Sequence, residues 1–161
     1  PADGLNEDPV LLHYLQPYLQ QINLLQEGQT YNIDGISFQA PLRHHHSVET
    51  YGFIFRTPRH TFSYISDTRY FDELINHYTG ELLVINVVRL DPGPYEHLSV
   101  PDATKIIRAI KPKVAILTHF GMTMWRAKPW EVANQVSQDT GVRVIAARDG
   151  MRFDMAELKD Y

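Results

Sequence analysis

The chain has 161 residues, of which 43% are hydrophobic and 21% charged, proportions typical of one globular domain with a buried core. The formal net charge of −4 provides no overall positive field, so nucleic acid is disfavoured as a partner. Cysteine is absent, which excludes disulfides and thiolate chemistry and leaves histidine, aspartate and glutamate as candidate metal ligands.

Segments that would place the chain in or across a membrane are not found. No apolar run approaches the roughly 20 residues that span a bilayer, and no charged-then-apolar leader opens the chain. We therefore expect no membrane partner and a cytoplasmic location. No repeat or low-complexity linker divides the sequence, so residues 1–161 are predicted to form a single domain.

The first part of the chain predicts one helix followed by β-structure. Residues 9–25 place apolar side chains at helical spacing, with Pro17 expected to kink or split the helix. Two short β-prone runs, 29–33 and 36–41, flank Asp34-Gly35, which is the composition of a tight hairpin. The runs YGFIFRT and HTFSYIS predict a second hairpin around Pro58-Arg59.

From Arg69 onward the pattern changes to alternating helices and strands. Helices are expected at 69–78, 99–110 and 129–140, and strands at 81–88, 113–120 and 142–147. Asp149-Gly150 indicates a turn between the last two strands. Meandering β-structure in the first half and alternation in the second predict an α/β fold.

The start of the helix at 99–110 can be argued from its capping residues. Ser99 is a good N-cap, Pro101 is tolerated in the first turn, and Asp102 complements the helix dipole. This places His97 in a loop immediately before a helix N-terminus.

Four polar residues come near the ends of predicted strands, where α/β proteins tend to place their sites. They are His46, Asp67, His97 and His119. Taken singly, each has an ordinary alternative as a turn residue, a satisfied structural histidine or a surface histidine. His46 ends a run of three histidines, and because neighbouring side chains alternate in direction beside a strand, at most one or two of the three can face a common site.

In the order and context of these four residues, the sequence resembles the C-terminal half of a metallo-β-lactamase-fold hydrolase. The branch it resembles holds ribonuclease Z and the PhnP-like cyclic phosphodiesterases. HSVETYGF places His46 at the metal-ligand position before a glycine-containing strand. YISDTRYFDEL matches the metal-bridging aspartate with Asp67, although Ser66 stands where glycine is commoner. AILTHF matches the late ligand with His119, and EHLSVPDATKII matches the loop histidine with His97.

The family's H-x-H-x-D-H loop is absent from these 161 residues, and the resemblance begins only at about Arg43. The expected fold is therefore an α/β metallo-β-lactamase-type αββα sandwich, of which this chain supplies roughly the C-terminal half. The opening Pro-Ala-Asp-Gly, which has no initiator methionine, agrees with a segment of a longer protein.

The resemblance implies a cofactor of two divalent metal ions that activate a bridging water. Zinc is the leading metal, with manganese or iron as alternatives. Asp67 would bridge the ions, His46 and His119 would each bind one, and His97 would act as general acid or as a donor to a phosphate oxygen. Because these ligands are too few for two ions, we expect activity to need the N-terminal half in cis or in trans. Association of two copies of the chain into a homodimer is the alternative partnership.

The expected substrate is a small or cyclic phosphodiester. The interval IFRTPRHTFSYI leaves no room for the long arm with which ribonuclease Z grips transfer RNA. Among the nearby arginines, Arg69 is the best candidate for a phosphate contact. Trp125 and Trp130 could line a pocket, although packing of the following helix is the simpler use. The alternative functions are a thioester or lactam hydrolase, a transfer-RNA 3′-processing ribonuclease, and a non-enzymatic binding remnant of the fold.

Overall fold

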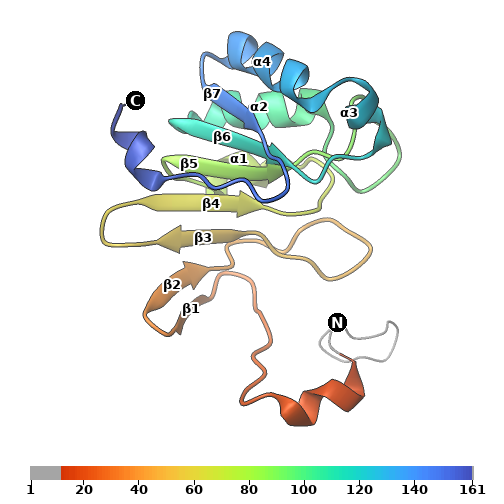
Figure 1. Cartoon of the computed structure of the whole chain (residues 1–161). Helices are drawn as coiled ribbons and strands as arrows, with labels where there is room; N and C mark the ends of the chain where they lie inside the picture. The colour runs from red at the N-terminus through yellow and green to blue at the C-terminus, as the bar shows by residue number, and fades with distance from the viewer. Residues whose placement is uncertain (1–11, 161) are drawn as a thin grey trace.

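A computed structural model describes residues 12–160, which fold around one mixed β-sheet (Figure 1). Its strands follow the order of the chain. They are β1 (Thr30–Ile33), β2 (Ile36–Gln39), β3 (Phe53–Arg56), β4 (Thr61–Ile65), β5 (Leu82–Asn86), β6 (Val114–Thr118) and β7 (Arg143–Ala146). Strands β1 to β4 pair antiparallel and β4 to β7 pair parallel, which confirms the predicted α/β class with its change of pattern near Arg69.

The first hairpin forms where Asp34-Gly35 predicts it. Ile33 pairs with Ile36, so the connection has the two-residue length of a tight turn. Asp34 and Gly35 have φ angles of 49° and 81°, and a type I′ turn requires positive φ at both central positions. This turn sets the register that places Tyr31 opposite Phe38.

The four α-helices of the described residues contribute to a single core on one face of the sheet. They are α1 (Glu73–His77), α2 (Val100–Ile110), α3 (Met122–Arg126) and α4 (Pro129–Thr140). The core joins strand residues such as Ile65, Ile85 and Leu117 to the helix residues Leu74, Ile106 and Val136. None of the helices in residues 12–160 is long and apolar enough to cross a membrane.

The opposite face of the sheet is covered less completely. A 3₁₀ helix near the C-terminus, η2 (Met155–Asp160), brings Leu158 into a small buried cluster with Leu82, Val114 and Ile116. Toward the antiparallel end of the sheet, an aromatic group remains only half-buried. We call it the aromatic face, and it consists of Phe38, Phe53, Phe55 and Phe62, whose rings contact one another.

Helix α2 begins as its sequence predicts. The Ser99 side chain accepts a hydrogen bond from the Asp102 backbone, and the Asp102 carboxylate accepts one from the Ser99 backbone at 2.9 Å. This reciprocal capping box satisfies two backbone donors that the helix itself cannot pair. Ser99 is fully buried, so the loop that carries His97 ends at a fixed point.

The helix predicted at 9–25 is wrong over the part that the structure describes, since residues 9–11 lie outside it. Between residues 12 and 25 the only helix is an exposed 3₁₀ helix, η1 (His13–Tyr18), which Figure 1 shows set apart from the sheet. Pro17 lies inside it, and none of its residues is buried. Helices of this length depend on burial of an apolar face, which is absent here.

Three smaller differences concern later elements. Helix α1 is shorter than the predicted 69–78, because the Arg69 amide donates to the His45 carbonyl and holds that residue in a loop. Helix α3 was not predicted. Asp149-Gly150 does form a turn, with Gly150 at a φ of 74°, but η2 follows it and the expected last strand is absent from the described residues.

Candidate metal centre

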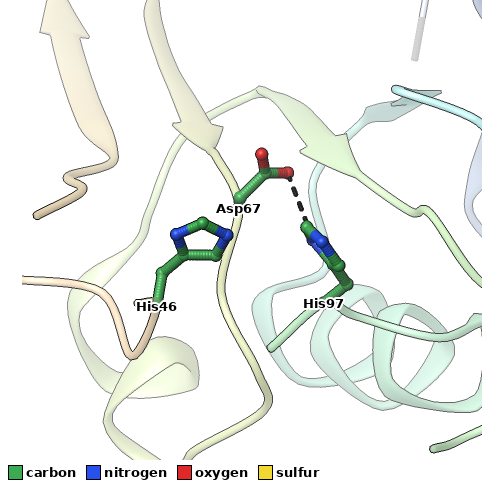
Figure 2. Close-up of side chains that lie close together, drawn as sticks. All are labelled: His46, Asp67 and His97. Atoms are coloured by element: carbon green, nitrogen blue, oxygen red, sulfur yellow. Dashed lines mark ion pairs between the residues drawn. The ribbon is translucent and has the colours of Figure 1, made fainter. Parts of the chain in front are cut away.

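The four residues singled out in the sequence meet at one edge of the sheet. Strands β4, β5 and β6 are parallel, so their carboxyl ends lie together. Asp67 follows β4, His97 lies between β5 and α2, and His119 follows β6. His46 lies in the loop before β3. Figure 2 shows its side chain together with those of Asp67 and His97.

Asp67 is the centre of this group. Ligand atoms of His46, Asp67 and His97 all lie within 4.8 Å of one another. Its Oδ1 is 3.7 Å from His97 Nδ1, the pair drawn as a dashed line in Figure 2, and its Oδ2 is 3.2 Å from Nε2 of His119. The two carboxylate oxygens therefore face different imidazoles, which is the arrangement a bridging carboxylate needs.

The donor set fits a divalent metal ion. His97 Nδ1 is buried and has no hydrogen-bond partner within residues 12–160. A buried polar atom without a partner costs about 1–3 kcal/mol, so this nitrogen marks a place where a further group is expected. Imidazole nitrogens beside a carboxylate are ligands that zinc accepts, and manganese and iron also bind such sets.

Asn86 orients Asp67, and sequence reasoning missed it. Asn86 is buried at the end of β5, and its Nδ2 donates to Asp67 Oδ1 at 2.9 Å. The Tyr64 hydroxyl in turn donates to Asn86 Oδ1 at 3.2 Å. An amide ending the otherwise apolar strand LLVIN was the available signal, because a polar side chain at the end of a buried parallel strand needs a partner.

His119 has an unusual backbone conformation. Its φ of 60° lies in the left-handed region, which few residues other than glycine adopt. The chain turns sharply there, and the Gly121 amide then donates to the Val88 carbonyl at 3.0 Å. Such backbone strain, of the order of 1 kcal/mol or more, is found mainly at functional sites.

The three consecutive histidines point to three different environments. His44 is buried, His45 stacks on Phe71 at a centroid distance of 4.0 Å, and His46 faces the candidate metal centre. Burial lowers the pKa of His44 to about 4, although a backbone hydrogen bond and the charge of Asp67 oppose the shift. All three line the pocket beside the centre, but only His46 belongs to the group of ligand atoms that lie within 4.8 Å of one another.

Arg69 lies beside the centre, in an open pocket of about 460 Å³ that also contains Arg43 and His46. Glu27 and Glu96 complete much of the polar lining, so the pocket carries both signs of charge. Trp125 and Trp130, each about half exposed, line a separate apolar groove between α3, α4 and β7. They are therefore not simply buried packing residues of the following helix.

The sheet, the helices on one face and the histidine–aspartate cluster define a protein of the metallo-β-lactamase fold class. Residues 3–120 match the beta-lactamase superfamily domain family, and the chain belongs to this family. The chain is also 29% identical over 163 residues to the uncharacterized protein MJ1374 of Methanocaldococcus jannaschii. That match covers 98% of this chain and 60% of MJ1374.

Solved structures of metallo-β-lactamase-fold proteins superpose on this chain. The metallo-beta-lactamase fold protein YhfI from Bacillus subtilis superposes with a TM-score of 0.69 at 19% identity, over 79% of this chain and 53% of YhfI. A diphosphatase from the PhnP family gives a TM-score of 0.64 at 20% identity, over 88% of this chain and 52% of the diphosphatase. The present chain thus spans about half the length of these structures, and at such identities the likeness is one of fold.

Proposed function

We propose that the chain forms part of a metal-dependent hydrolase whose substrate is a small or cyclic phosphodiester. The convergence of His46, Asp67 and His97 within 4.8 Å carries the proposal. Membership of the beta-lactamase superfamily domain family supports it. The cofactor we propose is a pair of divalent ions, zinc first, with manganese or iron as alternatives.

When bound, the ions would polarise a phosphoryl oxygen and supply a hydrolytic nucleophile at neutral pH. The residues of this chain would then act in separate roles. Asp67 would bridge the ions, held by the Asn86 amide, while His46 and His119 would each bind one ion. His97, whose Nδ1 lies 3.7 Å from Asp67 Oδ1, would act as the general acid toward the leaving oxygen or as a donor to a phosphate oxygen.

Two ions need more ligands than His46, Asp67 and His119 provide, because a zinc site takes about three protein ligands and a water. We propose that the N-terminal half of the same fold supplies the others, in cis or from a companion chain. The half-buried aromatic face supports this, because an apolar surface of this kind favours association with a further layer of protein. Pairing of two copies is the alternative partnership.

The proposed substrate class follows from the surroundings of the centre. Arg69 and Arg43 line the adjoining pocket, where a guanidinium can pair with a phosphate oxygen. The β3–β4 connection is a tight turn in which the Thr57 amide donates to the His60 carbonyl at 2.9 Å, so no arm projects there to hold transfer RNA. A small anionic ester fits these features better than a folded nucleic acid does.

The test combines metal content with two substrates. The chain alone is expected to retain fewer than two zinc ions after gel filtration and to hydrolyse little. The protein completed by its N-terminal half is expected to bind two ions and to cleave bis-p-nitrophenyl phosphate faster than a thioester. Two tightly held ions on the isolated chain would contradict the need for further ligands. A faster thioester reaction would favour the thioester or lactam class, and no hydrolysis by the completed protein would favour a binding remnant.

A further inference from the structure

We propose that His44 is a positioning residue, whose neutral imidazole, protonated on Nδ1, ties the strand end carrying Asp67 to the loop carrying His46. His44 is buried and is not one of the three residues whose ligand atoms converge at the candidate metal centre, although it lines the adjoining pocket. The functional consequence rests on the proposed metal centre, whereas the hydrogen-bonding state of His44 can be measured without any metal.

The position of the proton follows from Ser66. Its hydroxyl lies 2.7 Å from the Tyr51 carbonyl oxygen, which can only accept, so the single hydroxyl hydrogen is directed there. The same Oγ lies 3.0 Å from Nδ1 of His44. Having used its hydrogen, Ser66 must accept from this nitrogen, and Nδ1 therefore carries the proton.

The other ring nitrogen completes the chain of hydrogen bonds. His44 Nε2 lies 2.6 Å from the Tyr78 hydroxyl, whose oxygen accepts a hydrogen bond from the Gly52 backbone and whose own hydrogen is therefore directed to Nε2. With Nε2 accepting and Nδ1 protonated, the ring is neutral. Each polar atom of this buried chain thus has a partner, and only one imidazole tautomer satisfies all of them.

The chain links segments that are distant in sequence but adjacent to candidate ligands. Ser66 immediately precedes Asp67, and His44 lies two residues before His46. Tyr78 is the buried C-cap residue of α1, so the link is anchored in the core. The Arg69 amide also donates to the His45 carbonyl at 3.0 Å, so a backbone hydrogen bond joins the same two segments a second time.

The first measurement is the tautomer of His44 in the metal-free chain. Two-bond ¹H–¹⁵N correlation spectra of histidine-labelled protein distinguish a protonated Nδ1 from a protonated Nε2. We expect protonated Nδ1 in the wild-type chain, and a mixture of tautomers in Tyr78→Phe, where Nε2 loses its donor. A wild-type ring protonated on Nε2 would overturn the proposal.

The second measurement uses three replacements of His44. Asn places an amide N–H close to the position of Nδ1–H, Gln places its amide near Nε2, and Leu removes both bonds. Hydrogen exchange at the Arg69 amide is expected to stay near wild type in His44→Asn and to quicken at least tenfold in His44→Gln and His44→Leu. Equal exchange in all three variants would contradict a role for the Ser66 bond.

Zinc affinity separates this proposal from the proposed function. With the complete site, we expect affinity to fall about 10-fold or more in His44→Gln and His44→Leu, and to be largely kept in His44→Asn. His60→Asn is the matched control, since His60 is also largely buried and bonded to Glu81 at 3.0 Å, but precedes β4 at the opposite end from Asp67. If the wild-type protein bound no zinc, the proposed function would fail, while the tautomer and exchange results would still decide the role of His44.

Discussion

Asp67 contacts polar groups from three other segments of the chain, and its environment explains how separate weak signals form one site. Its two oxygens face Nδ1 of His97 and Nε2 of His119, and Asn86 fixes its orientation. The position of each residue after a strand was readable in the sequence, because parallel strands bring their carboxyl ends together. Asn86 and His44 were not predicted, because their partners are 19 and 22 residues away and only the folded chain brings them into contact.

Besides the proposed role as general acid, His97 could bind a metal ion, because one of its ring nitrogens lies within 4.8 Å of ligand atoms of His46 and Asp67, and a single variant separates the two roles. In the completed protein, we expect His97→Ala to lower phosphodiester hydrolysis by about 10²- to 10⁴-fold while the metal content stays at the wild-type level. Metal analysis and a hydrolysis assay on the same sample give both quantities. His77→Ala, at an exposed histidine in the last turn of α1, serves as the control. Loss of metal in parallel with activity would show that His97 is a ligand and not the acid.

At the level of elements, local sequence rules were reliable where local chemistry decides the structure. The Asp34-Gly35 turn and the Ser99 capping box involve only neighbouring residues, and both form as predicted. The helix predicted at 9–25 failed because helical spacing alone does not stabilise a helix whose apolar side has nothing to pack against in the described chain. Helix α1 was shortened by a long-range bond from Arg69 to His45, which no sequence pattern reveals.

Gly52, just before β3, illustrates an element boundary set by close packing. A Cβ at this position would overlap the Tyr78 hydroxyl and lie 2.6 Å from the Tyr64 carbonyl oxygen and 2.8 Å from Cε1 of His44. We expect Gly52→Ala to lower the free energy of unfolding by about 1–3 kcal/mol, since backbone must move to make room. Urea denaturation measures this.

Gly93→Ala is the control for Gly52→Ala, because the atoms nearest to its added Cβ all belong to the flexible end of the Arg89 side chain. Its free energy of unfolding is expected to change by less than about 0.5 kcal/mol. If Gly52→Ala proved equally harmless, the tight packing between β3 and α1 would not be a requirement of the fold.

For the whole molecule, the two faces of the sheet differ in how they are covered. Helices bury one face, whereas the aromatic face on the other side stays half-buried between β2 and β4. The sequence indicated an α/β chain of this class, and the fold confirms it. Whether the uncovered side receives the N-terminal half of the fold stays a prediction, to be decided by the reconstitution described above.

The stability of the whole metal-free chain should depend on pH through His44. The unfolded chain protonates this histidine below about pH 6.5, but the folded chain does so only below about pH 4, because burial disfavours the charged ring. The facing titratable groups are Tyr78, Asp67, His45 and His46, and Asp67 opposes the shift. The contribution of His44 to the free energy of unfolding is therefore fully present above pH 6.5. It is lost as the pH decreases toward 4, which lowers the free energy of unfolding by about 3 kcal/mol in total.

Urea denaturation of the metal-free chain between pH 7.5 and 4 measures this loss, with a chelator present. His44→Asn cannot take up the proton, so its stability should fall less over the same interval. An equal decrease in both proteins would show that His44 is not the group responsible.

The strand order also bears on how the chain acquires its structure during synthesis. Each strand from β2 to β7 pairs with the strand that precedes it in the sequence, and within the described residues no later strand inserts between two earlier ones. The sheet can consequently grow by one strand at a time as the polypeptide leaves the ribosome, without displacing pairs already made. The cluster is complete only after β6 is in register, since His119 follows this strand, so a nascent chain that ends before β6 carries the sheet from β1 to β5 but not the complete cluster.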